Sequence, residues 1–261
     1  MSELDVSDLN AVKPDPWAAL RAHTPARIAL GRSGNSLPTA EVLRFAAAHA
    51  LARDAVQTAL DSTALTAELQ ADGWAVHTLH SRAPDRATYL RRPDLGRRLH
   101  ADSADGVSAV AAALAAPPEL ALVLADGLSA QAAQVSGAAV LRGLRSALQG
   151  VVTLSPVFVA QQARVALADE VGALLKAQAV LMLLGERPGL SSPDSLGAYL
   201  SFAPRVGLAD ASRNCVSNIR PQGLGAQLAA ARLAWLVREA LRRRLTGVGL
   251  KDDSNKLVLG E

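Results

Sequence analysis

The sequence predicts an α/β fold, with a mainly parallel, Rossmann-like sheet covered by helices and a small N-terminal helical subdomain before it. Two observations support this fold class. Along residues 71–261, short apolar runs that stop at turn residues alternate with longer segments whose apolar residues recur at helical spacing. Such alternation is typical of a parallel sheet with helices on both faces. Before residue 71 the pattern indicates helices only.

The N-terminal part divides into a leader and a helical subdomain. Residues 1–14 are mostly polar, end at Pro14 and are expected to form a flexible leader. Residues 15–70 are expected to form the subdomain. It should contain a short helix over Trp17–His23 and a longer one over Thr39–Leu60, with Thr39 as the N-cap.

Residues 71–261 are expected to form the α/β domain. Its predicted helices are one or two over 92–115, then one each over 129–148, 167–178 and 224–245. The predicted strands cover residues 74–81, 121–124, 157–161, 179–184 and 214–219.

Composition and charge exclude some classes of protein. Half of the residues are hydrophobic but only 3% are aromatic, so the core must consist mainly of Ala, Leu and Val. The 27 basic and 24 acidic residues nearly balance, and the arginine clusters lack interleaved aromatic residues, which argues against nucleic-acid binding. There is no apolar run near 18 residues and no basic-then-apolar start, so we expect neither a membrane span nor a secretory signal.

Residues 185–220 contain the most informative motifs. An apolar run stops at Gly185, the charged residues Glu186 and Arg187 follow, and Pro188 then prevents a helix or strand from continuing. A glutamate at the carboxyl end of a buried strand points into the ligand crevice of many open α/β sheets. The alternative for Glu186 is a salt bridge to Arg187 or to another nearby arginine.

Two further candidates leave alternatives open. Asp126 follows an apolar strand and Ser129 can cap the next helix, so this turn could either bind a ligand or simply punctuate the chain. Cys215 is the only cysteine, so the chain has no internal disulfide, which fits a reducing cytoplasm. A lone cysteine is usually a small buried hydrophobe.

Cofactor motifs known from other folds are missing. The five histidines show no metal-ligand spacing, and the sequence contains neither a Walker loop nor Gly-x-Gly-x-x-Gly. The sequence also lacks Asp-x-His-x-x-Gly, the motif by which many cobalamin enzymes supply a histidine to cobalt.

Several motifs resemble one known family. They are GERPGL, SPDSLGAYLSFAP and RNCVSNIR within residues 185–220, with TPARIALGRSG, HALARDAV, YLRRPDLGRRL and LADGLSA upstream and TGVGLKD downstream. In this order they resemble the small (light-chain) subunit of ethanolamine ammonia-lyase, from Asp15 nearly to the end of the chain. The resemblance implies cofactor contacts at Val165, Glu186 and Cys215. From the residues alone, Val165 would be a core valine at the start of a helix.

The resemblance also implies a reaction and a partner. Enzymes of the family that the sequence resembles convert ethanolamine to acetaldehyde and ammonia with adenosylcobalamin. In these enzymes the groups that bind substrate lie on a separate large subunit. We therefore expect a hetero-oligomer, no catalytic residue on this chain, and base-on cobalamin. The alternatives are a structural subunit without a cofactor contact, and a free-standing hydrolase using Asp126, Glu186 and Ser129. The leader offers only a weak apolar stripe (Leu4, Val6, Leu9 and Val12), so a free cytoplasmic enzyme is expected rather than one packaged in a bacterial microcompartment.

Overall fold

The computed structural model describes residues 12–254 of the chain. Its contacts divide them into two units. One contains the described residues up to Asp54 together with Gly189–Ser192, and the other contains Ala55–Pro188 together with the residues from Pro193 onward. The apolar leader residues Leu4, Val6 and Leu9, on which the prediction about packaging depends, lie outside the described residues.

The first unit contains a short 3₁₀ helix, η2 (Ala18–His23), and most of the long helix α1 (Thr39–Gln57). Both helices occur where the sequence predicts them, although Thr39 is the first helical residue rather than the cap. In α1, Glu41 accepts hydrogen bonds from Arg21 at 3.2 Å and Arg44 at 2.5 Å. Apolar side chains of this unit remain exposed, including Trp17, Leu43 and Leu51.

The second unit is built on a six-stranded sheet with the order β1-β3-β2-β4-β5-β6. The first four strands in this order run parallel, whereas β5 is antiparallel to both of its neighbours. The strands are β1 (Val76–His80), β2 (Leu120–Ala125), β3 (Leu154–Gln161), β4 (Ala179–Gly185), β5 (Leu196–Phe202) and β6 (Arg213–Ile219).

Five of these strands lie where the sequence predicts them, but β5 was not predicted. Its presence makes the sheet mixed, so the description of a mainly parallel sheet holds only for β1 to β4. The reason lies in the connection between β4 and β5. Residues 186–195 contain no helix, and a connection without a crossover helix favours antiparallel pairing.

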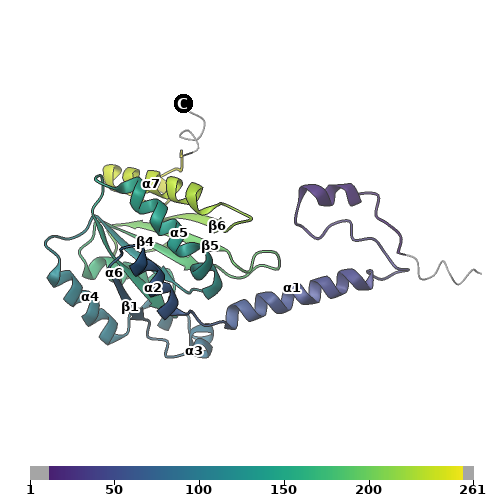
Figure 1. Cartoon of the computed structure of the whole chain (residues 1–261), viewed down its shortest axis with the longest axis horizontal. Coiled ribbons are helices and arrows are strands. Elements are labelled where there is room, and N and C mark those ends of the chain that lie inside the picture. Colours follow the sequence, from purple (N-terminus) through teal and green to yellow (C-terminus); the bar gives the residue numbers. More distant parts are fainter. Residues whose placement is uncertain (1–11, 255–261) are drawn as a thin grey trace, which may run out of the picture. The chain divides into compact units, whose positions relative to one another are not determined.

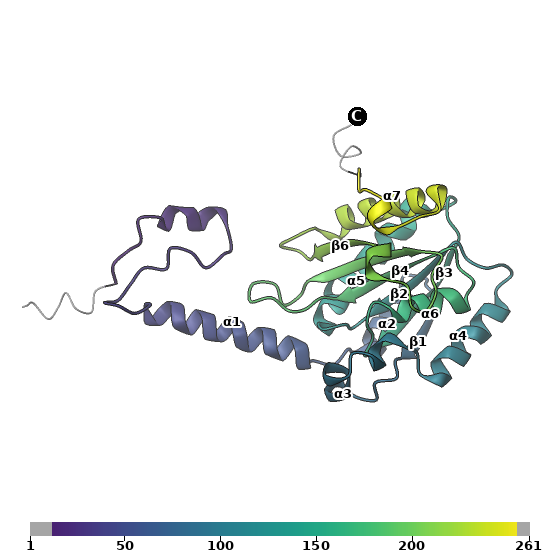
Figure 2. The same ribbon diagram turned by 180° about the vertical axis from the view of Figure 1, so that it is seen from behind.

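Helices cover both faces of the sheet (Figures 1 and 2). The side chains of β2 alternate between two apolar clusters, because Leu120, Leu122 and Leu124 face one layer while Ala121 and Val123 face the other. The first layer holds α2 (Ser62–Ala71), α5 (Ala130–Leu148) and α7 (Ala226–Arg243). The second layer holds α4 (Ala101–Ala113) and α6 (Leu167–Leu174).

Two short elements lie between β1 and α4, namely α3 (Arg86–Arg91) and the 3₁₀ turn η3 (Leu95–Arg97). The helical segment predicted over residues 92–115 is therefore η3 followed by α4. Two further 3₁₀ turns, η4 (Asp210–Ser212) and η5 (Gly247–Gly249), flank the last strand and the last helix. No helix among residues 12–254 is both long and apolar enough to cross a membrane.

The parallel strands β2, β3 and β4 end at one edge of the sheet, where Asp126, Gln162 and Glu186 follow them. Two glycines let the turns at this edge approach closely. A Cβ on Gly127 would lie 2.1 Å from the carbonyl oxygen of Gly185, and Gly127 has a φ of 54° that favours glycine. This edge is the place where open α/β sheets bind ligands.

Candidate cofactor-binding site

A cavity of about 650 Å³ lies at this edge of the sheet, on the face covered by α6. Its walls come from the turns and strand ends at this edge and from the α3–η3 segment. The lining residues are Tyr89, Pro93 and Arg97, Leu128 after β2, residues 164–166 after β3, residues 184–187 at the end of β4, Tyr199 of β5, and Asp210, Arg213 and Cys215 in and before β6. Its volume falls within the range of roughly 300–1,000 Å³ that is usual for small-molecule sites. Arg97, Arg187 and Cys215 line it and are exposed, so the cavity opens to solvent.

Glu186 lies where the sequence predicts it, directly after β4 and on the wall of the cavity. Its carboxylate accepts a hydrogen bond from the Ser195 hydroxyl at 2.5 Å and one from the Asn218 backbone N–H at 3.3 Å. No ion pair joins Glu186 to an arginine anywhere in residues 12–254, so the salt-bridge alternative is wrong for this structure. The carboxylate is positioned by neutral donors and keeps acceptor capacity for a ligand.

Cys215 lies on β6, directly across from Tyr199 of β5 in the antiparallel ladder. Both side chains line the cavity, and the expectation that Cys215 is a small buried hydrophobe is wrong because it is exposed. Partial desolvation in the cavity and the nearby Glu186 carboxylate raise the pKa of the Cys215 thiol. Desolvation likewise raises the pKa of the Tyr199 hydroxyl, so both groups stay protonated and neutral near pH 7.

Val165 lies in the turn between β3 and α6 and lines the same cavity, partly buried against the α6 layer. The turn is fixed by the Arg164 backbone N–H, which donates to the Gly96 carbonyl oxygen at 2.8 Å. The structure therefore brings Val165, Glu186 and Cys215 to one cavity, although they come from three different parts of the sheet.

Arg213 connects β6 to α6 beside the cavity. Its guanidinium donates to both carboxylate oxygens of Asp169 at 2.6 Å, and it also donates to Ser201 at 2.9 Å and Asp210 at 3.3 Å. The Arg213 and Asp169 side chains are almost completely buried, and such a bidentate pair is geometrically specific. The charge of Arg213 is thus already balanced by protein carboxylates.

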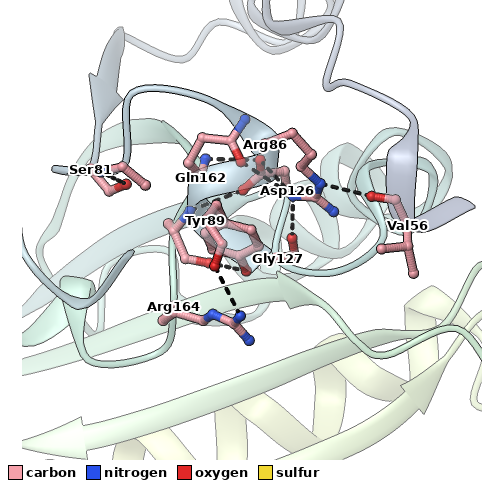
Figure 3. A network of polar contacts seen from close by, with 10 residues as sticks. Val56, Ser81, Arg86, Tyr89, Asp126, Gly127, Gln162 and Arg164 are labelled. Atoms are coloured by element: carbon pink, nitrogen blue, oxygen red, sulfur yellow. Dashed lines mark hydrogen bonds and ion pairs between the residues drawn. The ribbon is translucent and has the colours of Figure 1, made fainter. Parts of the chain in front are cut away.

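Asp126 is buried beneath this edge rather than exposed to a ligand (Figure 3). It accepts hydrogen bonds from the backbone N–H groups of Gln162 at 2.8 Å and Ala163 at 3.1 Å, and Arg86 lies 3.5 Å away. Burial raises the pKa of Asp126, although the two N–H donors and Arg86 oppose the shift. Its role is to join the turns after β2 and β3, which settles the open alternative in favour of a structural turn.

Ser129 is also structural. Its hydroxyl caps α5 by accepting from the Ala132 N–H at 3.3 Å and donates to the Pro193 carbonyl oxygen at 2.7 Å. Ser129 and Asp126 are both buried and engaged, so the hydrolase alternative that used them has no accessible nucleophile.

Sequence reasoning missed several residues of the cavity, including Arg97, Arg164 and Tyr199. Arg164 could have been found from its position next to Val165, whereas Tyr199 lies on the strand that was not predicted. None of the five histidines lines the cavity, and the described residues contain no cluster of potential metal ligands.

The fold and the cavity define an α/β protein with a cavity of small-molecule size at the carboxyl edge of a partly parallel sheet. A family model described as ethanolamine ammonia-lyase light chain matches residues 14–251. The chain belongs to this family.

Curated relatives agree with this assignment. An ethanolamine ammonia-lyase small subunit from Xanthomonas campestris is 54% identical over 247 residues, which cover 94% of this chain and 91% of the relative. The protein of the same name from Ralstonia nicotianae is 55% identical over 243 residues, covering 92% and 90% of the two chains. The one from Pseudomonas syringae is 53% identical over 247 residues, covering 94% and 86%.

Proposed function

We propose that this chain is the small subunit of an adenosylcobalamin-dependent ethanolamine ammonia-lyase, which converts ethanolamine to acetaldehyde and ammonia. The observation that carries the proposal is the family match over residues 14–251, together with relatives more than 50% identical along almost their whole length. A large subunit supplies the groups that bind substrate, and the two chains form a hetero-oligomer in the cytoplasm.

The chemistry of the cavity fits one side of a cobalamin. The corrin ring is apolar across its face and carries amide side chains around its rim. Val165, Leu128 and Leu184 offer apolar contacts, while Glu186 offers a carboxylate that can accept hydrogen bonds from amide N–H groups. Adenosylcobalamin supplies the adenosyl radical that abstracts hydrogen from substrate. The residues of this chain bind and orient; none of them takes part in the radical step.

Each proposed contact has its own task. Glu186 orients the ring through its rim amides, and Ser195 and Asn218 hold the carboxylate in place for this. Val165 packs against the apolar face, and Cys215 provides a neutral thiol beside Tyr199. Since no histidine lines the cavity, this chain offers no replacement ligand for cobalt, which supports base-on binding.

The position of the cavity supports the remaining parts of the proposal. All cavity residues lie within residues 71–261, the range of the expected α/β domain, which we propose is the domain that contacts cobalamin. Helix α5, which follows β2, packs on one face of the sheet, whereas α6, which follows the neighbouring strand β3, packs on the other face. This arrangement supports a Rossmann-like relationship and a ligand at the switch point between β2 and β3. Because the cavity is open to solvent, a partner subunit can complete its enclosure.

Reconstitution tests the proposed function. The chain and a large subunit of this family should be purified separately and mixed with adenosylcobalamin and ethanolamine. We expect acetaldehyde and ammonia only when both chains and the cofactor are present. The proposal is wrong if the isolated chain deaminates ethanolamine, or if the large subunit is fully active without it.

A further inference from the structure

Arg164 extends into the cavity without a carboxylate partner. Its guanidinium lies 4.3 Å from the centre of the Tyr89 ring, and one nitrogen donates to the Tyr89 carbonyl oxygen at 3.4 Å (Figure 3). Its Nε atom is buried and has no hydrogen-bond partner. An arginine that is stacked and only partly satisfied favours an additional acceptor, since leaving buried donors unpaired is costly.

The aliphatic part of the Arg164 side chain packs closely against Gly96. A Cβ at Gly96 would lie 2.9 Å from the Arg164 Cγ and 3.0 Å from the Tyr89 ring, so the absence of a side chain at Gly96 gives the arginine its place. The same segment bears Arg97, which also lines the cavity. The described residues offer neither Arg164 nor Arg97 an ion pair, whereas Arg213 is paired with Asp169.

The end of a helix adds to this positive wall. Val165 and Ala166 precede α6 and line the cavity, and Ala166 at the N-cap provides no capping side chain. The N–H groups of Leu167 and Ala168 already donate to carbonyl oxygens of the turn, whereas those of Val165 and Ala166 donate to no described residue. These two N–H groups and the helix dipole attract anions. Two unpaired guanidiniums and a helix N-terminus on one wall form a site with the chemistry to bind a phosphate.

We propose that Arg164, assisted by Arg97, binds the phosphodiester of the cofactor's nucleotide tail. The proposal rests on the proposed function and deepens it. Glu186 lies on the β4 side of the cavity and receives the uncharged rim amides, whereas the wall before α6 receives the single phosphate charge. This division gives the chain a way to distinguish a complete cobalamin from a corrinoid that lacks the tail.

The test uses three ligands on the assembled enzyme of large and small subunits. Cobalamin has the phosphate and the base, cobinamide phosphate has the phosphate without the base, and cobinamide has neither. Dissociation constants are measured by absorbance for the wild type, Arg164→Met, Arg97→Met and Arg164→Lys. Arg92→Met is the matched control, because Arg92 is exposed, pairs with Asp94 and does not line the cavity.

We expect Arg164→Met to weaken binding of cobalamin and cobinamide phosphate by about tenfold or more. Binding of cobinamide should be unchanged, Arg97→Met should show a smaller loss of the same kind, Arg164→Lys should restore part of the affinity, and Arg92→Met should behave as wild type. An equal loss for all three ligands, a loss for cobalamin alone, or no loss would overturn the phosphate assignment.

Measurements on the wild type keep the proposal testable if Arg164→Met does not assemble. Cobinamide phosphate should bind more tightly than cobinamide, and the difference should shrink as salt concentration rises. Equal affinities at low salt would overturn the inference while leaving the proposed function intact. An assembled wild type that binds none of the three ligands would instead contradict the proposed function.

Discussion

Glu186 is held by neighbours that contact it from different directions. Ser195 and Asn218 donate hydrogen bonds to one oxygen, while Gly197 lies against the other, because a Cβ built there would be 2.8 Å from Oε1. In the contact between position 197 and Glu186, the Glu186 side chain can move more easily than the backbone of the strand. A side chain at position 197 would therefore move Glu186 rather than disrupt the sheet.

Two variants test this arrangement together. Glu186→Gln removes the charge, and we expect cobalamin affinity of the assembled enzyme to fall by the equivalent of roughly 1.5–3 kcal/mol. Gly197→Ala keeps the charge but displaces it, so it should produce a loss of the same order with a small change in melting temperature. The double variant should be little worse than either single one, because both act on one interaction.

Glu239→Gln, which alters an exposed ion pair with Arg242, is the control for a lost carboxylate. Additive losses in the double variant would show that Gly197 acts independently of Glu186. Unchanged affinity with a large drop in melting temperature for Glu186→Gln would make this glutamate a structural residue.

Cys215 offers a test that needs no cofactor. The thiolate is the reactive form, so a raised pKa leaves less of it at neutral pH and slows alkylation. We expect the rate of iodoacetamide modification at pH 8 to be lower than that of a free thiol and to rise steadily above pH 9. In Glu186→Gln a nearby negative charge is removed, so the pKa should fall and the reaction should speed up.

Cys215 is the only cysteine in the chain, so mass spectrometry can follow its modification without interference. An alkylation rate that does not respond to Glu186→Gln would contradict the electrostatic link between the two residues.

The strands show what the sequence can and cannot predict about single elements. Strands β2 and β4 are unbroken apolar runs that end at glycine and charged residues, so their position was clear from the sequence. Strand β5 follows a loop rich in proline and serine, and its Gly197 and Ser201 weaken the apolar pattern. Its direction follows from a connection too short for a crossover helix, which could be deduced only once the strand was known.

Gly185 ends β4 and lies against the turn that follows β2. A Cβ there would lie 2.0 Å from the Ser129 carbonyl oxygen and 2.3 Å from that of Asp126, and backbone atoms cannot move away cheaply. We expect Gly185→Ala to lower the free energy of unfolding by roughly 2 kcal/mol or more, as measured by urea titration.

Gly106→Ala is the matched control for that substitution. Gly106 lies within α4 with open space around its Cβ position, so alanine should stabilise the helix by up to about 1 kcal/mol. Equal effects of the two substitutions would show that the close approach at Gly185 does not matter.

At the scale of the whole molecule, the candidate site depends on distant parts of the chain. Glu186 was identified from local pattern and from family resemblance, because a charge directly after a buried strand is unusual. The role of Val165 came from the resemblance alone, since a valine at the start of a helix looks like core. Arg164 could have been found from its place next to Val165, whereas Tyr199 becomes recognisable only when the sheet order places β5 beside β4 and β6.

The placement of all five histidines away from the cavity leads to a spectroscopic prediction. If only the histidines of this subunit carry ¹⁵N, the hyperfine pattern of cob(II)alamin in the assembled enzyme should match that of the unlabelled enzyme. Cofactor labelled in its own base should change the pattern, which serves as the positive control. A change caused by the labelled histidines would show that this chain supplies a cobalt ligand.

Two walls of the cavity differ in the hydrogen bonding of their backbone amides: the strand β5, which is paired with a strand on each side, and the turn at residues 165 and 166. Tyr199 lies in the middle of a strand that is paired on both sides, so its backbone amide should exchange with deuterium slowly even without ligand. The amides of Val165 and Ala166 donate no hydrogen bond to any described residue and should exchange quickly. Ligand binding should therefore slow exchange mainly at residues 165 and 166, because the ligand would shield two amides that have no acceptor in its absence. Protection confined to β5 would show instead that the strand is the adaptable side.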